Sequence, residues 1–300
     1  MKVSAVYINT YRRDYPFARI CIASIRYWYP EIPIFLIKDM GAGDFSTADA
    51  EKYFQVQVLD TGGKTFGWGF GKFEPLFAKG GEHFLFMDAD TVMTGPVIDA
   101  VADIHADFIV DDERQPFGKL VHLYYHPEKI REVYPGFTYP GYTFNTGQWF
   151  ATSGILHRED FQELVSWSPQ PTLRYPEIFR QADQGVFNFI LHRQEAAGRV
   201  TVQRIPLMIW PDGGAADHIS LSSIREKKNA LPRIIHWAGM KRSKMEEFPR
   251  TDILDFYEDF FYARAGQAQR IRDRLAIAQD KVTDMAKRIT RKLTGASGKK

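Results

Sequence analysis

Apolar residues in this 300-residue chain form short continuous runs that alternate with segments of helical periodicity. Polar or turn-forming residues bound each run, which is the pattern of strands buried inside a sheet. Apolar positions at residues 17–29 recur at helical spacing until Pro30 and Pro33 end the helix. This order predicts βαβ units and an α/β fold with a mixed, mostly parallel central sheet flanked by helices. The predicted strands of this first part lie at residues 3–8, 34–37, 56–59 and 84–87.

The second half of the chain continues this alternation less regularly. An aromatic-rich passage at residues 118–147 has little periodicity, and its rings serve either to cover the core or to stack on a sugar. Residues 182–191 form an amphipathic helix with Asp183 as a natural N-cap, whereas Gln184 beside it has no such simple role. Further elements are predicted as strands at 108–110, 204–210 and 233–236, and as a helix at 159–167.

The strand at residues 84–87 runs directly into two carboxylates, Asp88 and Asp90. Side chains alternate faces along a strand, so the two carboxylates are expected to point the same way, with Ala89 opposite. In open α/β sheets, ligands bind outside the carboxyl ends of the strands, where this pair falls. Two oxygen anions there suit a hard divalent cation that carries substrate phosphates. We favour this metal site over a pair of solvated acids, but the pair alone does not define the reaction.

Glycine-rich segments give weaker signals. No Gly-x-Gly-x-x-Gly follows the first strand, so the dinucleotide-binding fingerprint is absent. Residues 67–73 contain three glycines but lack the spacing of a phosphate-binding P-loop. We interpret the segment as a flexible loop that delivers Lys72 to the carboxyl edge of the sheet, although a solvated surface lysine fits the spacing nearly as well.

Other polar residues follow the later strands. The acids at residues 111–113 follow a predicted strand, and we interpret them as a solvated loop rather than a second acidic lip. His236 ends a strand and is followed by Lys241 and Arg242. A lone histidine is more often a core residue than a ligand. In this position it can also join the two aspartates as a metal ligand while a base holds phosphate oxygens.

Composition limits the class of protein. The chain is 44% hydrophobic and 14% aromatic, which is enough to bury a large core. Its net charge of +2 gives no indication of a nucleic-acid partner. Cys21 is the only cysteine, so no disulfide can form within the chain, which fits a reducing compartment. Without an apolar run of membrane-spanning length or a signal-peptide pattern, we expect a cytoplasmic enzyme.

Positive charge is concentrated at the C-terminal end. Residues 263–300 hold 11 Lys and Arg but 3 Asp and Glu. From Thr251 the pattern is helical, with an aromatic patch followed by apolar residues at alternating spacings of 4 and 3. We expect one domain at residues 1–250 and a basic helical tail at 251–300. The tail either lies on an anionic membrane as a peripheral attachment or self-associates through residues 251–294, and its charge favours the membrane slightly.

Four short blocks, in order along the chain, resemble those of GT-A fold glycosyltransferases, most closely the family 8 retaining enzymes. Asp88-Ala89-Asp90 resembles the Asp-x-Asp that holds manganese against the diphosphate of a sugar nucleotide. Asn145-Thr146-Gly147 is similar to the Asn-Ser-Gly block at the donor sugar, and the segment 183–188 to the Asp-Gln-x-x-x-Asn helix start beside the reacting carbon. His236-Trp237-Ala238-Gly239 resembles the His-x-x-Gly whose histidine completes the metal site.

The resemblance implies a GT-A (Rossmann-like) fold and a role for each matching residue. Mn²⁺ or Mg²⁺ would be held by Asp88, Asp90 and His236. The catalytic residues would be Asp183, Gln184 and Asn145. The donor-binding residues would be Ile8, Asn9, Thr10 and Tyr11 at the nucleobase and ribose, and Lys72, Ala89, Gly147, Gly239, Lys241 and Arg242 along the rest of the donor.

Two departures from the family pattern affect this assignment. After the His-x-x-Gly glycine, the family usually has a lysine three residues on and then Pro-Trp. This chain has Lys241 two residues on, Arg242 three residues on and no Pro-Trp, so the base that holds the phosphate is not fixed. Lys72-Phe73-Glu74-Pro75 also resembles related mannosyltransferase groups.

The resulting hypothesis is a metal-dependent glycosyltransferase. It would move a hexose from a nucleoside-diphosphate sugar, with UDP as the expected carrier, to a glycan or lipid-linked acceptor with retention. One alternative is a haloacid-dehalogenase-type phosphatase, because the strand ending in Asp88 resembles the first motif of those enzymes. In that fold this strand normally comes first, whereas three strands precede it here. A second alternative is a non-catalytic protein that binds nucleotide sugars.

Overall fold

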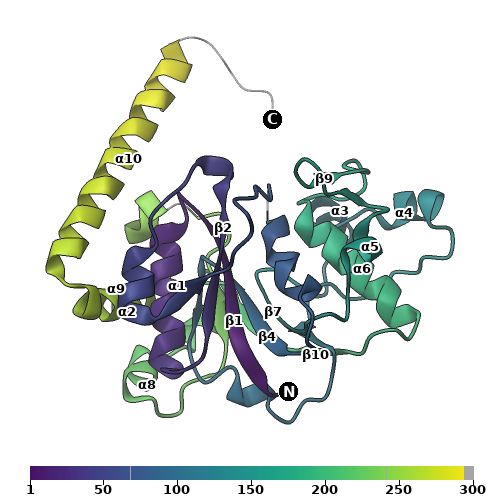
Figure 1. Cartoon of the computed structure of the whole chain (residues 1–300), viewed down its shortest axis with the longest axis horizontal. Coiled ribbons are helices and arrows are strands. Elements are labelled where there is room, and N and C mark those ends of the chain that lie inside the picture. The colour runs from purple at the N-terminus through teal and green to yellow at the C-terminus, as the bar shows by residue number, and fades with distance from the viewer. Residues whose placement is uncertain (68, 241, 294–300) are drawn as a thin grey trace.

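A computed structural model describes residues 1–67, 69–240 and 242–293 of the chain (Figure 1). The strands are β1 (Val3–Tyr11), β2 (Ile34–Asp39), β3 (Val56–Val58), β4 (His83–Asp88), β5 (Thr91–Met93), β6 (Phe108–Asp111), β7 (Gln148–Thr152), β8 (Val165–Ser166), β9 (Thr172–Leu173), β10 (Val202–Ile205), β11 (Met208–Ile209) and β12 (Ile234–His236). The α-helices are α1 (Tyr15–Trp28), α2 (Ala48–Phe54), α3 (Phe117–Leu123), α4 (Pro127–Val133), α5 (Arg158–Phe161), α6 (Asp183–Ala196), α7 (Gly214–Asp217), α8 (Leu221–Glu226), α9 (Thr251–Ala265) and α10 (Gln267–Leu293). The 3₁₀ helices are η1 (Met40–Ala42), η2 (Phe70–Phe77), η3 (Asp99–Val101) and η4 (Arg242–Glu247).

The central sheet has seven strands in the order β10-β6-β7-β4-β1-β2-β3. Strand β7 pairs antiparallel with both of its neighbours, and the remaining pairs are parallel. The predicted mixed, mostly parallel sheet is therefore confirmed. In the parallel register Asn9 lies opposite Asp88, and Tyr11 lies opposite Asp39. Since parallel strands end at the same edge, this register gathers polar side chains at the carboxyl edge of β1, β2 and β4.

Alternation along β4 divides the core into two clusters. Leu85 and Met87 belong to one cluster, whereas Phe84 and Phe86 belong to the other. The first cluster lies under α1 and α9, and the second lies under α6 and is rich in aromatic rings. Figure 1 shows these helices on opposite sides of the sheet. Both faces are thus buried, which explains why the strand reads as a continuous apolar run.

A second, three-stranded sheet in the order β11-β12-β5 carries the chain back to the carboxyl edge of β4. Strand β5 follows Asp90 directly, and β12 pairs antiparallel with it so that His236 lies opposite Thr91. The backbone N–H of Trp237 donates to the carbonyl of Asp90 at 3.0 Å. Residues far apart in sequence are therefore fixed side by side by ordinary ladder hydrogen bonds.

Three sequence-based expectations are wrong in detail. The helix expected at 159–167 ends as α5 at Phe161, because Val165 turns into β8 and pairs with β9. The single strand expected at 204–210 divides into β10, which pairs with β6 in the central sheet, and β11, which pairs with β12. Residues 118–147 are more regular than their composition indicates. They contain most of α3 and all of α4, and their buried rings Tyr124, Tyr125, Tyr142 and Phe144 fill the second core cluster.

Helices α9 and α10 differ in burial. Helix α9 packs against α1 in the first core cluster, and its Phe261 ring stacks on Phe54 with centroids 4.6 Å apart. Helix α10 is tied at its start by an ion pair from Arg19 to Asp273 at 3.1 Å and then extends away from the body (Figure 1). Its apolar side chains Ile271, Leu275, Val282 and Met285 are 60–69% exposed.

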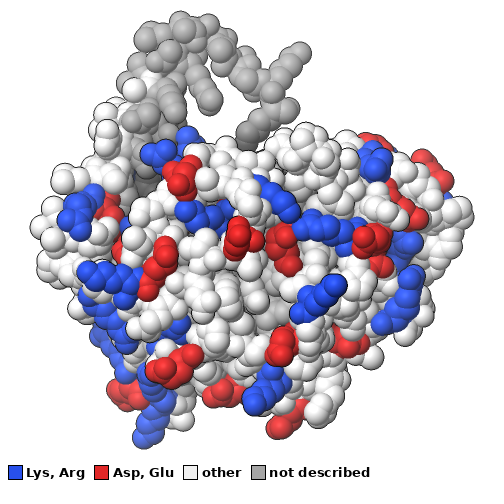
Figure 2. Space-filling view, viewed as in Figure 1, with Lys and Arg blue, Asp and Glu red and all other residues white. Residues whose placement is uncertain are grey.

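Charged side chains are distributed over the face that Figure 2 shows. Lys and Arg are interspersed there with Asp and Glu, apart from a group of adjoining Lys and Arg at the lower left. Among the described residues, no helix is both long enough and apolar enough to span a membrane.

The packing of α9 leads to a stability prediction. Phe261→Ala removes a buried ring from the core and should lower the free energy of unfolding by about 3–5 kcal/mol. Leu275→Ala on the exposed α10 is the matched control and should change it by less than about 0.5 kcal/mol. Denaturant unfolding of both variants measures the difference. Equal effects would contradict the assignment of α9 to the core.

Candidate active site

A cavity of about 930 Å³ opens at the carboxyl edge of the central sheet. It collects most of the residues that the sequence singles out: Asn9, Tyr11, Lys72, Asp88, Ala89, Asp90, Asn145, Asp183, Gln184, His236 and Gly239. Ile8 and Thr10 are buried within β1 and do not line the cavity, so only their backbone positions shape it. Lys241 and the side chain of Arg242 lie outside the described part of the chain.

Asp88, Asp90 and His236 form a group whose potential ligand atoms all lie within 4.8 Å of one another. Asp88 ends β4, Asp90 occupies the turn into β5, and His236 ends β12. The Nε2 atom of His236 lies 3.1 Å from Asp90. The two carboxylates thus lie together as expected, although Asp90 lies beyond the end of the strand.

Burial and charge oppose each other within this group. Burial raises the pKa of Asp88, and the nearby Lys72 ammonium does not fully offset it. Burial also acts to raise the pKa of Asp90, but His236 outweighs it and lowers that pKa. For His236, burial favours the neutral ring, whereas Asp90 prevails and raises its pKa. Asp90 and His236 therefore stabilise each other's charged forms, whereas burial makes the charged form of Asp88 less favourable than it is in water.

The donor atoms of the group fit a divalent cation. Two carboxylates and one imidazole are ligands that Mn²⁺ and Mg²⁺ accept, and Mn²⁺ tolerates nitrogen well. The Nδ1 atom of His236 is buried without a hydrogen-bond partner among the described residues, as is the amide oxygen of the adjacent Asn9. Unpaired buried polar atoms are costly, and a bound cation or ligand is one way to satisfy them.

Lys72 lines the cavity and is buried. Its Nζ atom is 2.7 Å from Asp183 and 3.3 Å from Asp88, and it donates to the carbonyl of Thr146 at 3.2 Å. Burial alone would lower the pKa of Lys72, but the two carboxylates outweigh it and raise the pKa above its usual range. The segment is not the flexible loop that we expected, because Lys72 belongs to the 3₁₀ helix η2.

Asp183 and Gln184 begin helix α6, and the expected N-cap is wrong. The capping position is Ala182, and no side chain caps the helix. The carboxylate of Asp183 instead accepts a hydrogen bond from the Thr146 hydroxyl at 3.1 Å, in addition to its ion pair. Gln184 donates to the carbonyl of Leu123 at 3.2 Å. Both side chains thus line the cavity and do not cap the helix.

Two glycines allow these close approaches. A Cβ atom at Gly147 would lie 2.3 Å from Cε1 of His236. A Cβ atom at Gly185 would lie 2.1 Å from the carbonyl oxygen of Tyr124. Because such distances are far below van der Waals contact, the glycine after Asn145-Thr146 and the glycine after Asp183-Gln184 are steric requirements of the site. Gly147 itself is buried behind His236 and does not line the cavity.

The Asn145 segment is held from both sides. The side-chain oxygen of Asn145 accepts the N–H of Gly147 at 2.8 Å. Asn188, five residues after Asp183, is fully buried and exchanges two hydrogen bonds of 2.9 Å with the backbone of Phe144. The last residue of the Asp-Gln block therefore positions the Asn145 block.

Several cavity residues were not anticipated from the sequence. Asp39 at the end of β2 and Asp14 before α1 line the cavity, and the register of β1 and β2 was the signal that could have located Asp39. Trp210 stacks on His236 with centroids 5.8 Å apart. Glu113 lines the cavity and accepts a hydrogen bond from the Tyr124 hydroxyl.

The solvated loop expected at residues 111–113 is therefore wrong. Asp111 is buried and accepts the backbone N–H groups of Leu207 and Met208 at 2.7 and 3.2 Å. It holds the connection from β10 to β11 in place. Only Asp112 of the three is exposed.

Comparison with known proteins places the fold. No family model and no curated protein sequence matches the chain. Among solved structures, the bifunctional glycosyltransferase WbbM is 14% identical over 88% of this chain with a TM-score of 0.57, and the chain spans 52% of WbbM. The galactosyltransferase LgtC, solved with donor and acceptor sugar analogs, is 14% identical over 87% of this chain and 96% of its own, with a TM-score of 0.53. GlyE of Streptococcus pneumoniae is 14% identical over 86% of this chain and 63% of its own, with a TM-score of 0.51.

These likenesses confirm the GT-A fold that the four sequence blocks implied. At this level of identity they concern the architecture. The activity has to be argued from the side chains in the cavity.

Asp14 leads to a prediction about pH. Burial, followed by repulsion from Asp90, raises the pKa of Asp14 to about 7 despite a hydrogen bond from Tyr11. A raised carboxyl pKa contributes stability that is present below about pH 4 and is lost as the pH rises through about 7. Asp14→Asn should therefore become more stable than the wild type above about pH 7, by roughly 1–3 kcal/mol.

Urea unfolding from about pH 4 to pH 8 measures this difference, with Asp212→Asn on the exposed surface as the control. The control should follow the wild-type curve. If the stability of Asp14→Asn also followed the wild-type curve with pH, the raised pKa of Asp14 would be refuted.

Proposed function

We propose that this protein is a metal-dependent glycosyltransferase that uses a nucleoside-diphosphate sugar, with UDP as the carrier. The observation that carries the proposal is the grouping of Asp88, Asp90 and His236 in one cavity with Lys72 and Asp183. Such a cavity offers a cation site for a diphosphate and polar groups for a sugar. The GT-A fold and the four sequence blocks support the same activity, and they favour the family 8 retaining enzymes.

Asp88, Asp90 and His236 would hold Mn²⁺ or Mg²⁺. When bound, the cation supplies Lewis-acid stabilisation of the diphosphate that leaves as the glycosidic bond breaks. Lys72 keeps its proton between two carboxylates, and its positive charge would attract the diphosphate of the donor into the cavity. Lys241 or Arg242 is proposed to act on the same phosphate oxygens.

The cavity residues indicate which end of the donor binds where. Asn9, Tyr11 and Asp39 lie at the ends of β1 and β2, where we propose that the nucleobase and ribose bind. Asp183 and Gln184 lie at the start of α6, and with Asn145 they would contact the sugar. Their oxygens would stabilise positive charge that develops at the anomeric carbon, and hydrogen bonds from Thr146 and to Leu123 fix their orientation. Retention of configuration belongs to this proposal.

Two alternatives are less well supported. The GT-A fold is not the haloacid-dehalogenase fold, in which the first aspartate of the motif attacks phosphorus. Here Asp88 is ion-paired to Lys72 and grouped with a histidine. A non-catalytic nucleotide-sugar-binding protein would use the same cavity, and binding without hydrolysis or transfer with any acceptor would favour it.

The exposed apolar side chains Ile271, Leu275, Val282 and Met285 form a seam along α10. This seam supports a further part of the proposal, namely peripheral attachment of the protein to an anionic membrane surface. Leu275 and Val282 are 66% and 69% exposed, and cationic residues accompany them along the helix. An amphipathic helix of this kind binds a bilayer through apolar area together with attraction to anionic lipid. Self-association through residues 251–294 is the competing possibility.

The metal site can be tested by substitution. Asp90→Asn should abolish most Mn²⁺ binding, measured by electron paramagnetic resonance, because one anionic ligand and the charge that balances His236 are lost. At ligand concentrations about a hundredfold above Kd, UDP with Mn²⁺ should stabilise the wild type by roughly 2–3 kcal/mol, and the variant should lose this gain. Asp112→Asn, an exposed carboxylate outside the group, is the control and should behave as the wild type. Undiminished Mn²⁺ affinity and UDP-sugar hydrolysis in Asp90→Asn would refute the assignment.

The tail can be tested with vesicles. Wild-type protein should sediment with vesicles that contain anionic lipid and not with neutral ones. Leu275→Glu combined with Val282→Glu should abolish this binding, whereas Ala276→Glu, which lies off the seam, should retain most of it. If the double variant instead converts an oligomer to a monomer in light scattering and vesicle binding is absent throughout, the helix is a self-association element.

A further inference from the structure

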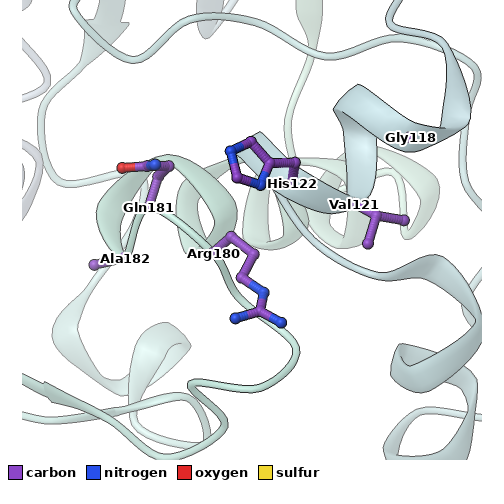
Figure 3. Close-up of a pocket in the computed structure, with 6 residues that line it drawn as sticks. All are labelled: Gly118, Val121, His122, Arg180, Gln181 and Ala182. Atoms are coloured by element: carbon purple, nitrogen blue, oxygen red, sulfur yellow. The ribbon is translucent and has the colours of Figure 1, made fainter. Parts of the chain in front are cut away.

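A second cavity of about 680 Å³ lies beside the donor cavity. It is formed between α3 and the segment that enters α6 (Figure 3). Figure 3 shows the imidazole of His122 between the side chains of Gln181 and Val121, and the side chain of Arg180 extending away from them with its guanidinium at the far end. The six lining residues are Gly118, Val121, His122, Arg180, Gln181 and Ala182.

The two cavities adjoin at a fixed boundary. Gln181 lines both of them. It lies two residues before Asp183 and three before Gln184, the side chains that we place at the donor sugar. A molecule in the second cavity is therefore next to the sugar end of the donor rather than to the nucleotide end.

The boundary has an unusual backbone. Gln181 and Ala182 have φ values of 46° and 30°, a region that side-chain-bearing residues rarely adopt. Such strain persists only where surrounding contacts hold it, and it is common at binding sites. Here the N–H of Arg180 donates to the carbonyl of Tyr124 at 3.0 Å, and Gly185 allows the same carbonyl to approach. The contacts hold α3 and the 180–182 segment as the two walls of one cavity.

The two cavities differ in charge. Six carboxylates line the donor cavity: Asp14, Asp39, Asp88, Asp90, Glu113 and Asp183. No described residue that lines the second cavity is acidic, and Arg180 makes no ion pair with any described residue. Its exposed guanidinium presents a planar set of donors that match phosphate or carboxylate oxygens. His122 and Gln181 add further hydrogen-bond donors to the lining of the same cavity.

We propose that this cavity, termed the acceptor cavity, binds an acceptor that carries a phosphate or carboxylate group near the hydroxyl that receives the sugar. The inference rests on the proposed glycosyl transfer and specifies its second substrate. The anionic group would bind Arg180 or His122, and the hydroxyl would extend past Gln181 toward the anomeric carbon. The acceptor oxygen forms the new bond to that carbon, the bond from the carbon to the diphosphate breaks, and the diphosphate leaves with the electron pair. The hydroxyl proton passes to the released diphosphate.

Matched monosaccharide probes test the proposal. The affinities of glucose, glucose 6-phosphate and glucuronate are measured by calorimetry on the full chain saturated with UDP and Mg²⁺. At least one anionic probe should bind about tenfold more tightly than glucose, because a charge-assisted contact is worth about that factor. The stronger of the two anionic probes distinguishes a phosphate-bearing from a carboxylate-bearing acceptor.

Substitutions test whether Arg180 and His122 cause the preference for anionic probes. His122→Gln combined with Arg180→Gln should bring the three affinities together, whereas Lys119→Gln, an exposed cation of α3 that does not line the cavity, should leave them unchanged. All of these positions are exposed, and unfolding curves confirm that the variants are folded. Equal affinities in the wild type, no binding of either anionic probe, or a preference that survives the double substitution would overturn the proposal.

The same titrations separate this inference from the proposed function. If UDP with Mg²⁺ binds and only the charge preference is absent, the acceptor assignment fails and the donor site stands. If UDP does not bind the wild type, the proposed function fails. The nucleotide-free titration of the anionic probes then shows whether the cavity prefers anions.

Discussion

The buried ammonium of Lys72 is the interaction on which the site depends. It joins Asp183 at the start of α6 with Asp88 at the end of β4, and it donates to the carbonyl of Thr146 just before β7. One cation therefore fixes three segments that lie far apart in sequence. Without it, two partly buried carboxylates would each carry a desolvation cost that no cation offsets, which explains why so polar a cluster depends on this lysine.

The remaining charges in the cavity are not balanced by this lysine. His236 compensates Asp90, but burial still raises the pKa of Asp88, and Asp14 also has a raised pKa. A divalent cation between Asp88, Asp90 and His236 would supply the missing positive charge, and a diphosphate would then complete the coordination. The neighbouring cavity, with Arg180 and no acidic lining residue among those described, would have the opposite preference. The two substrates would thus be separated by electrostatics as well as by shape.

The sequence predicted the features that depend on local pattern. Patterns of adjacent residues were enough to predict the buried strands, the position of the aspartate pair and the four short blocks. Together these features led to the correct fold. The ion pair between Lys72 and Asp183 could not be predicted from the sequence, because no local pattern near either residue identifies its distant partner. For the same reason Asp183 was interpreted as an N-cap and Asp111 as solvated, whereas both bind partners that are distant in sequence. The helix expected at 159–167 failed because pairing of β8 with β9 overrides local propensity.

We propose that one cation site and one sugar site share the cavity at the carboxyl edge of the sheet. A crystal structure of the protein grown with UDP and Mn²⁺, with anomalous data that locate manganese, is the decisive measurement. We expect one manganese peak within bonding distance of Asp88, Asp90 and His236, next to the diphosphate. A manganese peak elsewhere, or a nucleotide bound with Lys72 and Asp183 remote from it, would refute the shared site.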